Sequence, residues 1–210
     1  IMDRTAIILA GSSLKGFDSD KGLVNLANKP LILHVIERVQ SLVDEVIVCV
    51  KSSNQQSLYT PIIPENSKIV VDLEGFPESP LTSAMTGLSS SQGEYSIILP
   101  CDTPFISKMV VNLMFEIAVG VDAVVPRWPD GRIEPLQAVY RTRRALDSAR
   151  EALSRGELRM ESMIHRLRRV RYLSTIVIKE IDPKLLTFFN ISTPLDLRRA
   201  EMLAGRVGLG

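Results

Sequence analysis

Residues 6–21 read AIILAGSSLKGFDSDK, and this stretch decides the fold. It begins with five apolar or small residues, which are typical of a buried parallel strand. A loop of small and flexible residues follows, and it ends in Asp20 and Lys21. In such a loop backbone N–H groups can converge on an anion while a lysine supplies positive charge. The stretch therefore predicts a strand that leads directly into a phosphate-binding loop.

Short apolar strands alternate with longer helical patterns along the rest of the chain, which is typical of an α/β sheet. We expect strands at residues 5–10, 45–50, 68–71, 95–99, 121–126 and 135–140. We expect helices at residues 30–40, 81–89 and 107–119, a short segment at 55–59, two amphipathic helices after residue 140 and a last helix after residue 193. Residues 171–179 are expected to form a β segment. Pro30 is expected in the first turn of its helix, where its missing N–H costs nothing.

The composition is typical of a compact domain with little net charge and no strong overall electrostatic field. With 210 residues and 45% hydrophobic content the chain can bury a full core, and we expect a single domain over residues 1–210. The 25 basic and 24 acidic side chains nearly cancel, which argues against nucleic acid or a membrane as the main partner. The first apolar run, residues 6–10, is too short for a signal peptide or a membrane span, so we expect a cytoplasmic protein. Cys49 and Cys101 are expected to be buried free thiols.

Polar residues follow several of the expected strands. The loop of residues 11–21 leaves the first strand, Asp72 follows KIVV, Asp102 lies in PCDTPF after residues 95–99, and Asn190 follows LTFF. In an open parallel sheet, ligands bind beyond the carboxyl ends of the strands. We therefore expect these loops to face one crevice, which holds a nucleotide with its metal.

Several segments of this chain also occur in a familiar order. They are LAGSSLKGFDSDKGL, a lone aspartate after KIVV, SPLTSAM, LPCDTPFI, EPLQAVY and FFNISTPLDL. From about residue 5 to about residue 204, this order resembles that of molybdenum cofactor guanylyltransferases. The resemblance implies a Rossmann-like three-layer α/β sandwich with a mostly parallel central sheet, of the nucleotidyltransferase type. It also implies transfer of GMP from Mg²⁺-bound GTP to the phosphate of molybdopterin, with release of pyrophosphate.

The first loop departs from the pattern of that family, which usually has two adjacent glycines followed by an arginine. This sequence has Gly11-Ser12 and Lys15-Gly16 instead. Ser12 brings a Cβ close to the phosphates, and the compact ammonium of Lys15 does not reproduce the bidentate fork of an arginine. Two alternatives within the enzyme class stay open: a cytidylyltransferase, or a guanylyltransferase acting on another phosphorylated acceptor. A third alternative is a nucleotide-binding protein without turnover.

Nucleotidyl transfer depends on charge stabilisation more than on a general base, because a phosphate acceptor with a second pKa of about 6 is already largely ionised at neutral pH. Asp102 is the expected Mg²⁺ ligand, since this ion takes oxygen ligands and often uses one carboxylate with phosphate and water. Lys21 is expected to neutralise triphosphate charge, with Lys15 as a second candidate. The alternatives are that Asp102 caps the following helix and that Lys21 is an ordinary solvated lysine.

Recognition of the base is assigned to Asp72, whose carboxylate can accept hydrogen bonds from N1–H and the exocyclic amine of guanine. The resemblance implies that guanine is also held by Asn54 and by the backbone near Leu9 and Gly11. Ala10 and Ser12 are assigned to nucleotide binding in the same loop. The alternatives are that Asp72 is a turn residue ending its strand and that Asn54 caps a short helix.

The acceptor side of the crevice is assigned to Glu134, Asn190 and Ser192, which line it or orient waters on the metal. Thr193 and Pro194 are interpreted as the N-cap and first residue of the last helix. The basic stretch RLRRVR, residues 166–171, is interpreted as a solvated helix face rather than a nucleic-acid site. Its alternative is a surface for an anionic pterin phosphate, or for transient contact with molybdenum cofactor insertion or acceptor proteins.

Overall fold

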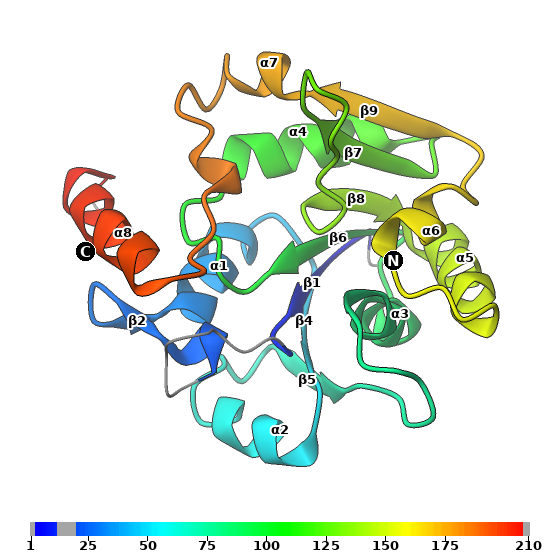
Figure 1. The fold of residues 1–210 in the computed structure, drawn as a ribbon, viewed down its shortest axis with the longest axis horizontal. Coiled ribbons are helices and arrows are strands. Elements are labelled where there is room, and N and C mark those ends of the chain that lie inside the picture. The colour runs from blue at the N-terminus through cyan, green and yellow to red at the C-terminus, as the bar shows by residue number, and fades with distance from the viewer. Residues whose placement is uncertain (1–2, 12–19, 208–210) are drawn as a thin grey trace.

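A mostly parallel sheet forms the middle layer of the protein (Figure 1). The computed structural model describes residues 3–11 and 20–207, so that the predictions on Ser12 and Lys15 lie outside the described residues. The strands of the described sheet are β1 (Arg4–Leu9), β4 (Glu45–Val50), β5 (Lys68–Val71), β6 (Tyr95–Pro100), β7 (Ala123–Arg127), β8 (Ala138–Arg141) and β9 (Val170–Ser174). Within these residues their order is β5-β4-β1-β6-β8-β7-β9, and β8 runs antiparallel to both of its neighbours.

Helices cover both faces of this sheet, as the predicted three-layer architecture requires. In Figure 1, α1 (Leu31–Val39) and α4 (Lys108–Ala118) lie on one side, whereas α3 (Pro80–Ser90), α5 (Thr142–Ser154) and α6 (Met160–Ile164) lie on the other. The remaining described α-helices are α2 (Ser53–Tyr59), α7 (Thr175–Ile178) and α8 (Pro194–Val207). Two short 3-10 helices, η1 (Lys21–Leu23) and η2 (Leu186–Phe188), complete the described helical segments.

The strand that opens the chain shows why its sequence is continuously apolar. Ala6 and Ile8 pack in the core beneath α1 and α4, while Ile7 and Leu9 pack in the core beneath α3 and α5. A strand covered on both faces has no solvated side, and its sequence therefore lacks the apolar and polar alternation of a half-exposed strand. This double burial fixes the loop that follows β1 at the carboxyl edge of the sheet.

A β-hairpin lies between η1 and α1, and the sequence patterns did not predict it. Its strands are β2 (Asn25–Leu26) and β3 (Lys29–Pro30), and Ala27 and Asn28 have φ values of 49° and 61°. Positive φ at both central residues is the mark of a type I′ turn, which usually carries Asn-Gly or Asp-Gly. Because alanine occupies the first of these positions, the sequence does not show the usual pattern of this turn. Pro30 thus lies at the N-cap position in β3, and α1 begins one residue later than expected.

Two expectations for the C-terminal third are wrong. The predicted β segment of residues 171–179 ends at Ser174, whose Oγ accepts a hydrogen bond from Ile176 N at 3.2 Å and caps α7. Asn190 does not follow a strand, because the residues before it form η2. The apolar side chains of both segments pack against the core, so that burial alone did not distinguish helix from strand.

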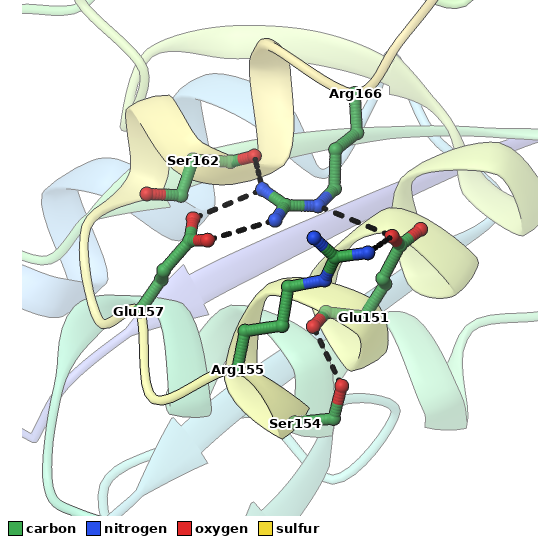
Figure 2. A network of polar contacts seen from close by, with 6 residues as sticks. All are labelled: Glu151, Ser154, Arg155, Glu157, Ser162 and Arg166. Carbon is green, nitrogen blue, oxygen red and sulfur yellow. Dashed lines mark hydrogen bonds and ion pairs between the residues drawn. The ribbon is translucent and has the colours of Figure 1, made fainter.

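The basic stretch is not a helix face, because residues 166–171 leave α6 and enter β9. Figure 2 shows that the Arg166 guanidinium is held between neighbouring acidic groups. It donates to both carboxylate oxygens of Glu157 at 3.0 and 2.8 Å and to the Ser162 carbonyl at 2.7 Å. Glu151 lies 3.8 Å from Arg166 Nε and also pairs with Arg155 at 2.9 Å. With its side chain 19% exposed, Arg166 connects α5 and α6 rather than forming an open cationic surface.

The last helix packs beside the hairpin, as Figure 1 shows for α8 and β2. Ala200 and Ala204 of α8 share a small apolar cluster with Leu26 of the hairpin and with Phe105, which lies in the loop after β6. Just before α8, Ile191 N donates to the Asp102 carbonyl at 3.1 Å. The C-terminal segment is thereby fixed to the loop that carries the predicted metal ligand.

Cys49 and Cys101 are buried free cysteines, as predicted. Across residues 3–11 and 20–207, no helix combines the length and the apolar character needed to cross a membrane.

Candidate active site

A cavity of about 700 Å³ opens at the carboxyl ends of the central strands. Leu9 and Gly11 reach it from the end of β1, Lys51 from β4, Asp72 from β5 and Asp102 from β6. The predicted crevice beyond the strand ends is therefore present, and it is also lined by Lys21, Glu134 and Asn190. Leu9, Lys51, Asp72 and Asp102 are far apart in the sequence but meet here because adjacent parallel strands end at one edge.

Lys21 and Asp102 are in direct contact at this cavity. Lys21 Nζ lies 2.5 Å from Asp102 Oδ2, and the two side chains are 15% and 3% exposed. Lys21 comes from η1 at the end of the first loop, and Asp102 comes from the loop after β6. The arrangement excludes the alternative that Lys21 is a solvated lysine.

The other alternative, that Asp102 caps a helix, is also wrong. The following helix, α4, begins at Lys108, six residues further along the chain. Its N-cap is Ser107, whose Oγ accepts a hydrogen bond from Val110 N at 3.3 Å. Asp102 therefore does not cap α4. Capping does not explain why its carboxylate is buried at the wall of the cavity.

The carboxylate of Asp102 fits a hard divalent cation. Its Oδ2 is buried and has no partner in hydrogen-bond geometry among the described residues, although Lys21 forms an ion pair with it. Burial raises the pKa of Asp102, and the Lys21 ammonium opposes that rise. In the described part of the chain, no cluster of three or more His, Cys, Asp or Glu side chains is arranged to hold a metal. One carboxylate completed by phosphate oxygens and water is the arrangement that Mg²⁺ commonly takes.

Asp72 presents a second, partly buried carboxylate to the same cavity. Its Oδ2 accepts a hydrogen bond from Ser83 Oγ at 2.6 Å, and its backbone N donates to the Val50 carbonyl at 2.8 Å. Its Oδ1 is buried and lacks a hydrogen-bond partner within residues 3–11 and 20–207. Burial raises the pKa of Asp72, with Glu78 adding to the rise and Ser83 opposing it. Asp72 lines the cavity, and an unpartnered acceptor on its side chain suits a ligand that brings its own N–H donors.

The opposite wall carries part of the predicted acceptor side. Glu134 accepts a hydrogen bond from Trp128 Nε1 at 2.8 Å and lines the cavity, as does Asn190. Asn190 Nδ2 donates to Ser192 Oγ at 3.1 Å, but Ser192 itself is not part of the cavity wall. Ser192 lies before α8, whose N-cap is Thr193 as predicted.

The cap of α8 is reciprocal. Thr193 Oγ1 accepts from Asp196 N at 3.2 Å, while Asp196 Oδ2 accepts from Thr193 N at 3.0 Å. Such a capping box satisfies two helix-end donors at once. Thr193 is therefore explained by helix formation, whereas Asn190 faces the cavity.

Two of the residues assigned to nucleotide binding, Ala10 and Asn54, do not line the cavity. Ala10 is fully buried, and its carbonyl accepts a hydrogen bond from Gln55 Nε2 at 2.7 Å. Asn54 is exposed near the start of α2. It does not cap that helix, because Ser52 Oγ accepts from Gln55 N at 3.2 Å. The guanine contact assigned to Asn54 stays a prediction.

Sequence reasoning missed several residues of this site. Lys51, Glu78, Ser83, Gln137 and Phe188 line the cavity. Gln55, buried behind the wall, joins two strand ends by donating to Ala10 and accepting from Lys51 N at 2.8 Å. Lys51 could have been predicted from the sequence, because it follows the strand of residues 45–50 just as Asp72 follows its own strand. The others depend on side-chain packing that no spacing rule reveals.

Comparison with known proteins agrees with this geometry. The family model described as MobA-like NTP transferase domain matches residues 6–170. A protein named molybdenum cofactor guanylyltransferase from Desulfosudis oleivorans is 33% identical, over 97% of this chain and 98% of its own. A protein named "Probable molybdenum cofactor guanylyltransferase" from Methanosarcina mazei is 32% identical, over 92% of this chain and 88% of its own.

Among solved structures, molybdopterin-guanine dinucleotide biosynthesis protein A from Archaeoglobus fulgidus shares the fold. Its TM-score is 0.81 at 24% identity, over 96% of this chain and 99% of that chain. The match to the family model, over residues 6–170, includes the strand ends, the first loop and the Asp102 loop. The chain therefore belongs to the MobA-like NTP transferase family of nucleotidyltransferases.

Proposed function

We propose that the protein transfers GMP from Mg²⁺-bound GTP to the phosphate of a molybdopterin-type acceptor and releases pyrophosphate. The observation that carries this proposal is the meeting of Lys21, Asp102 and Asp72 in one cavity. The names of the relatives from Desulfosudis oleivorans and Methanosarcina mazei support the choice of guanine and of the cofactor.

The reaction exchanges one phosphoanhydride bond for another. An oxygen of the acceptor phosphate attacks the α-phosphorus of GTP, the bond between the α-phosphorus and the bridging oxygen breaks, and pyrophosphate leaves with that oxygen. The acceptor is already largely ionised at neutral pH, with a second pKa of about 6, so that no general base is needed. The protein's task is to hold two anions in line and to stabilise the charge that develops.

Lys21 and Asp102 divide this electrostatic work. Lys21 places an ammonium against triphosphate oxygens, where a preorganised charge in a partly buried site is effective. Asp102 supplies the protein oxygen that would hold the divalent cation. When bound, Mg²⁺ would supply Lewis-acid polarisation of phosphate oxygens and partial neutralisation of the leaving group. The buried, incompletely partnered Oδ2 of Asp102 supports this division of roles.

The base is assigned to the end of the cavity that holds Asp72. Its buried Oδ1 accepts a hydrogen bond from N1–H or the exocyclic amine of guanine, and Ser83 keeps the other oxygen in place. Glu134 and Asn190, on the wall formed by later segments of the chain, face the acceptor. This orientation puts the α-phosphate between the two ends of the cavity.

Pyrophosphate release tests the proposal. The purified protein is incubated with GTP, CTP, ATP or UTP and Mg²⁺, each with and without molybdopterin. Release with GTP that requires molybdopterin is the expected result. Release with CTP instead would point to a cytidylyltransferase, and release with a different phosphorylated acceptor would reassign the second substrate. No release with any triphosphate would overturn the assignment to an active transferase.

A further inference from the structure

Lys51 lies beside Asp72 at the edge of the sheet. The register of β4 and β5 pairs Val50 with Val71, so that the next residues, Lys51 and Asp72, leave neighbouring strand ends. The backbone of Lys51 is fixed by its hydrogen bond to Gln55 Oε1 at 2.8 Å. A Cβ added to Gly11 would lie 3.7 Å from Lys51 Cβ and 3.9 Å from Ser83 Oγ. Lys51 therefore belongs to the same small region as the Asp72 carboxylate.

The ammonium of Lys51 is only weakly engaged. Its Nζ lies 3.3 Å from Glu78 Oε1, and the two side chains are 38% and 70% exposed. Ion pairs as exposed as this one contribute little to stability, and water screens them. Asp72 does not take the ammonium, since its Oδ2 accepts from Ser83 and its Oδ1 has no hydrogen-bond partner in the described part of the chain. This wall of the cavity thus offers an unused acceptor next to a donor that is easily released.

That pair of groups matches the edge of guanine. Guanine presents two donors, N1–H and the 2-amino group, beside the O6 acceptor. Asp72 can serve the donors, and a lysine, which carries three donors and no acceptor, can serve O6. Adenine presents an amino group where guanine has O6, and an ammonium opposite it would find a donor instead of an acceptor.

We infer that Lys51 is a specificity-determining residue that leaves Glu78 and donates a hydrogen bond to O6 of the bound guanine. This inference rests on the proposed function, because it requires guanine to lie against Asp72. Asp72 alone would select for N–H donors, and Lys51 adds selection for the acceptor next to them.

The experiment measures the affinity of the full chain for GTP, 6-thio-GTP and CTP by calorimetry with Mg²⁺. The analogue 6-thio-GTP keeps N1–H and the 2-amino group but replaces O6 with sulfur, a weaker acceptor. Lys51→Met, which keeps the length of the side chain, is expected to weaken GTP binding roughly 10- to 100-fold, the weight of one charge-assisted hydrogen bond. Binding of 6-thio-GTP and CTP should change less than about threefold. Lys51→Arg should retain most of the preference for GTP.

Three outcomes separate this inference from the proposed function. If Lys51→Met weakens all three nucleotides equally, Lys51 acts on the phosphates and the inference is wrong. If the parent protein prefers GTP and Lys51→Met keeps that preference, the inference is wrong while guanine recognition stands. If the parent protein binds GTP and CTP equally, guanine recognition and this inference fail together. Glu78→Gln is the matched variant, and it should keep or strengthen the preference for GTP because it frees Lys51.

Discussion

The ion pair between Lys21 and Asp102 brings together the two side chains that the proposed reaction assigns to opposite sides of one triphosphate. The Lys21 ammonium contacts the same Asp102 oxygen that would bind the cation. A triphosphate that attracts Lys21 therefore also exposes Asp102 to the metal, and we expect nucleotide and cation to bind cooperatively. Most of this pair was predictable, because each residue follows a strand that ends at the same edge. Their direct contact was not, since it depends on the path of the first loop.

Asp102→Asn should leave the fold intact and remove most of the Mg²⁺-dependent turnover. The amide keeps the size of the side chain but lacks the negative charge that holds a divalent cation. A metal that stabilises transition-state charge is worth several kcal/mol, so the turnover number should fall by about 10²-fold or more. Pyrophosphate release measures this loss, and circular dichroism checks the fold. Near-normal turnover would remove Asp102 from the metal site.

Lys21→Ala should lower kcat/KM by about 10²-fold, comparable to the loss of one preorganised donor. The same variant should bind Mn²⁺ more tightly than the parent when no nucleotide is added, because Asp102 loses its competing ammonium. Electron paramagnetic resonance of free Mn²⁺ measures that change. Lys29→Ala is the control, since Lys29 pairs with Glu37 on the surface and does not line the cavity. Equal effects of the two substitutions would contradict the assigned role of Lys21.

Asp72→Asn should stabilise the protein near neutral pH while it reduces the preference for GTP. Burial raises the pKa of Asp72 in the folded state above its ordinary value of 3.8. Below pH 3.8 the carboxyl is protonated in both the folded and the unfolded chain, and its full contribution to stability is present. As the pH rises through the folded-state pKa, the native protein must ionise a partly buried group and that contribution is lost. The advantage of the variant should therefore grow between pH 4 and pH 7 in urea unfolding, and a constant difference would contradict this origin.

At the scale of elements, α3 lies close against the sheet because Gly87 has no side chain. A Cβ at Gly87 would overlap Ile7 of β1 and lie 2.9 Å from Cys49 Sγ of β4. Gly87→Ala should lower the free energy of unfolding by about 1–3 kcal/mol through overpacking. Gly205→Ala, in α8 with no atom within 4 Å of the added Cβ, should instead raise it by up to about 1 kcal/mol. Thermal unfolding of both variants measures the contrast, and the same sign for both would contradict it.

The elements also show where sequence patterns succeed and fail. The strands that build the site, β1, β4, β5 and β6, were predicted from their apolar runs. Of these, β1, β4 and β6 are buried on both faces, whereas β5 is a half-buried edge strand. The hairpin before α1 was missed because Ala27 occupies a left-handed turn position that usually takes asparagine, aspartate or glycine. Residues 175–178 were assigned to a strand because short apolar runs fit both periods, and the Ser174 cap decides for a helix.

Over the whole molecule, the cavity wall that carries Glu134 and Asn190 depends on contacts between distant segments. Gln137 Nε2 donates to the Thr187 carbonyl at 2.5 Å, and Ser107 N donates to Thr187 Oγ1 at 3.2 Å. With the hydrogen bond from Ile191 to Asp102, these contacts draw the C-terminal segment across the end of the sheet. The sequence predicted that Lys21, Asp72 and Asp102 face one cavity, because strand order brings their loops together. It also assigned Glu134 and Asn190 to this wall, and both line the cavity. It did not predict the contacts that hold the wall in place, because no strand register determines where the C-terminal segment crosses.

A crystal structure of the protein with GTP and Mg²⁺ tests the central claim most directly. We predict that one oxygen of Asp102 ligates the cation together with triphosphate oxygens, and that Lys21 Nζ has moved from Asp102 to the phosphates. The guanine should lie against Asp72. A triphosphate bound away from the first loop, or a cation held without Asp102, would contradict the account.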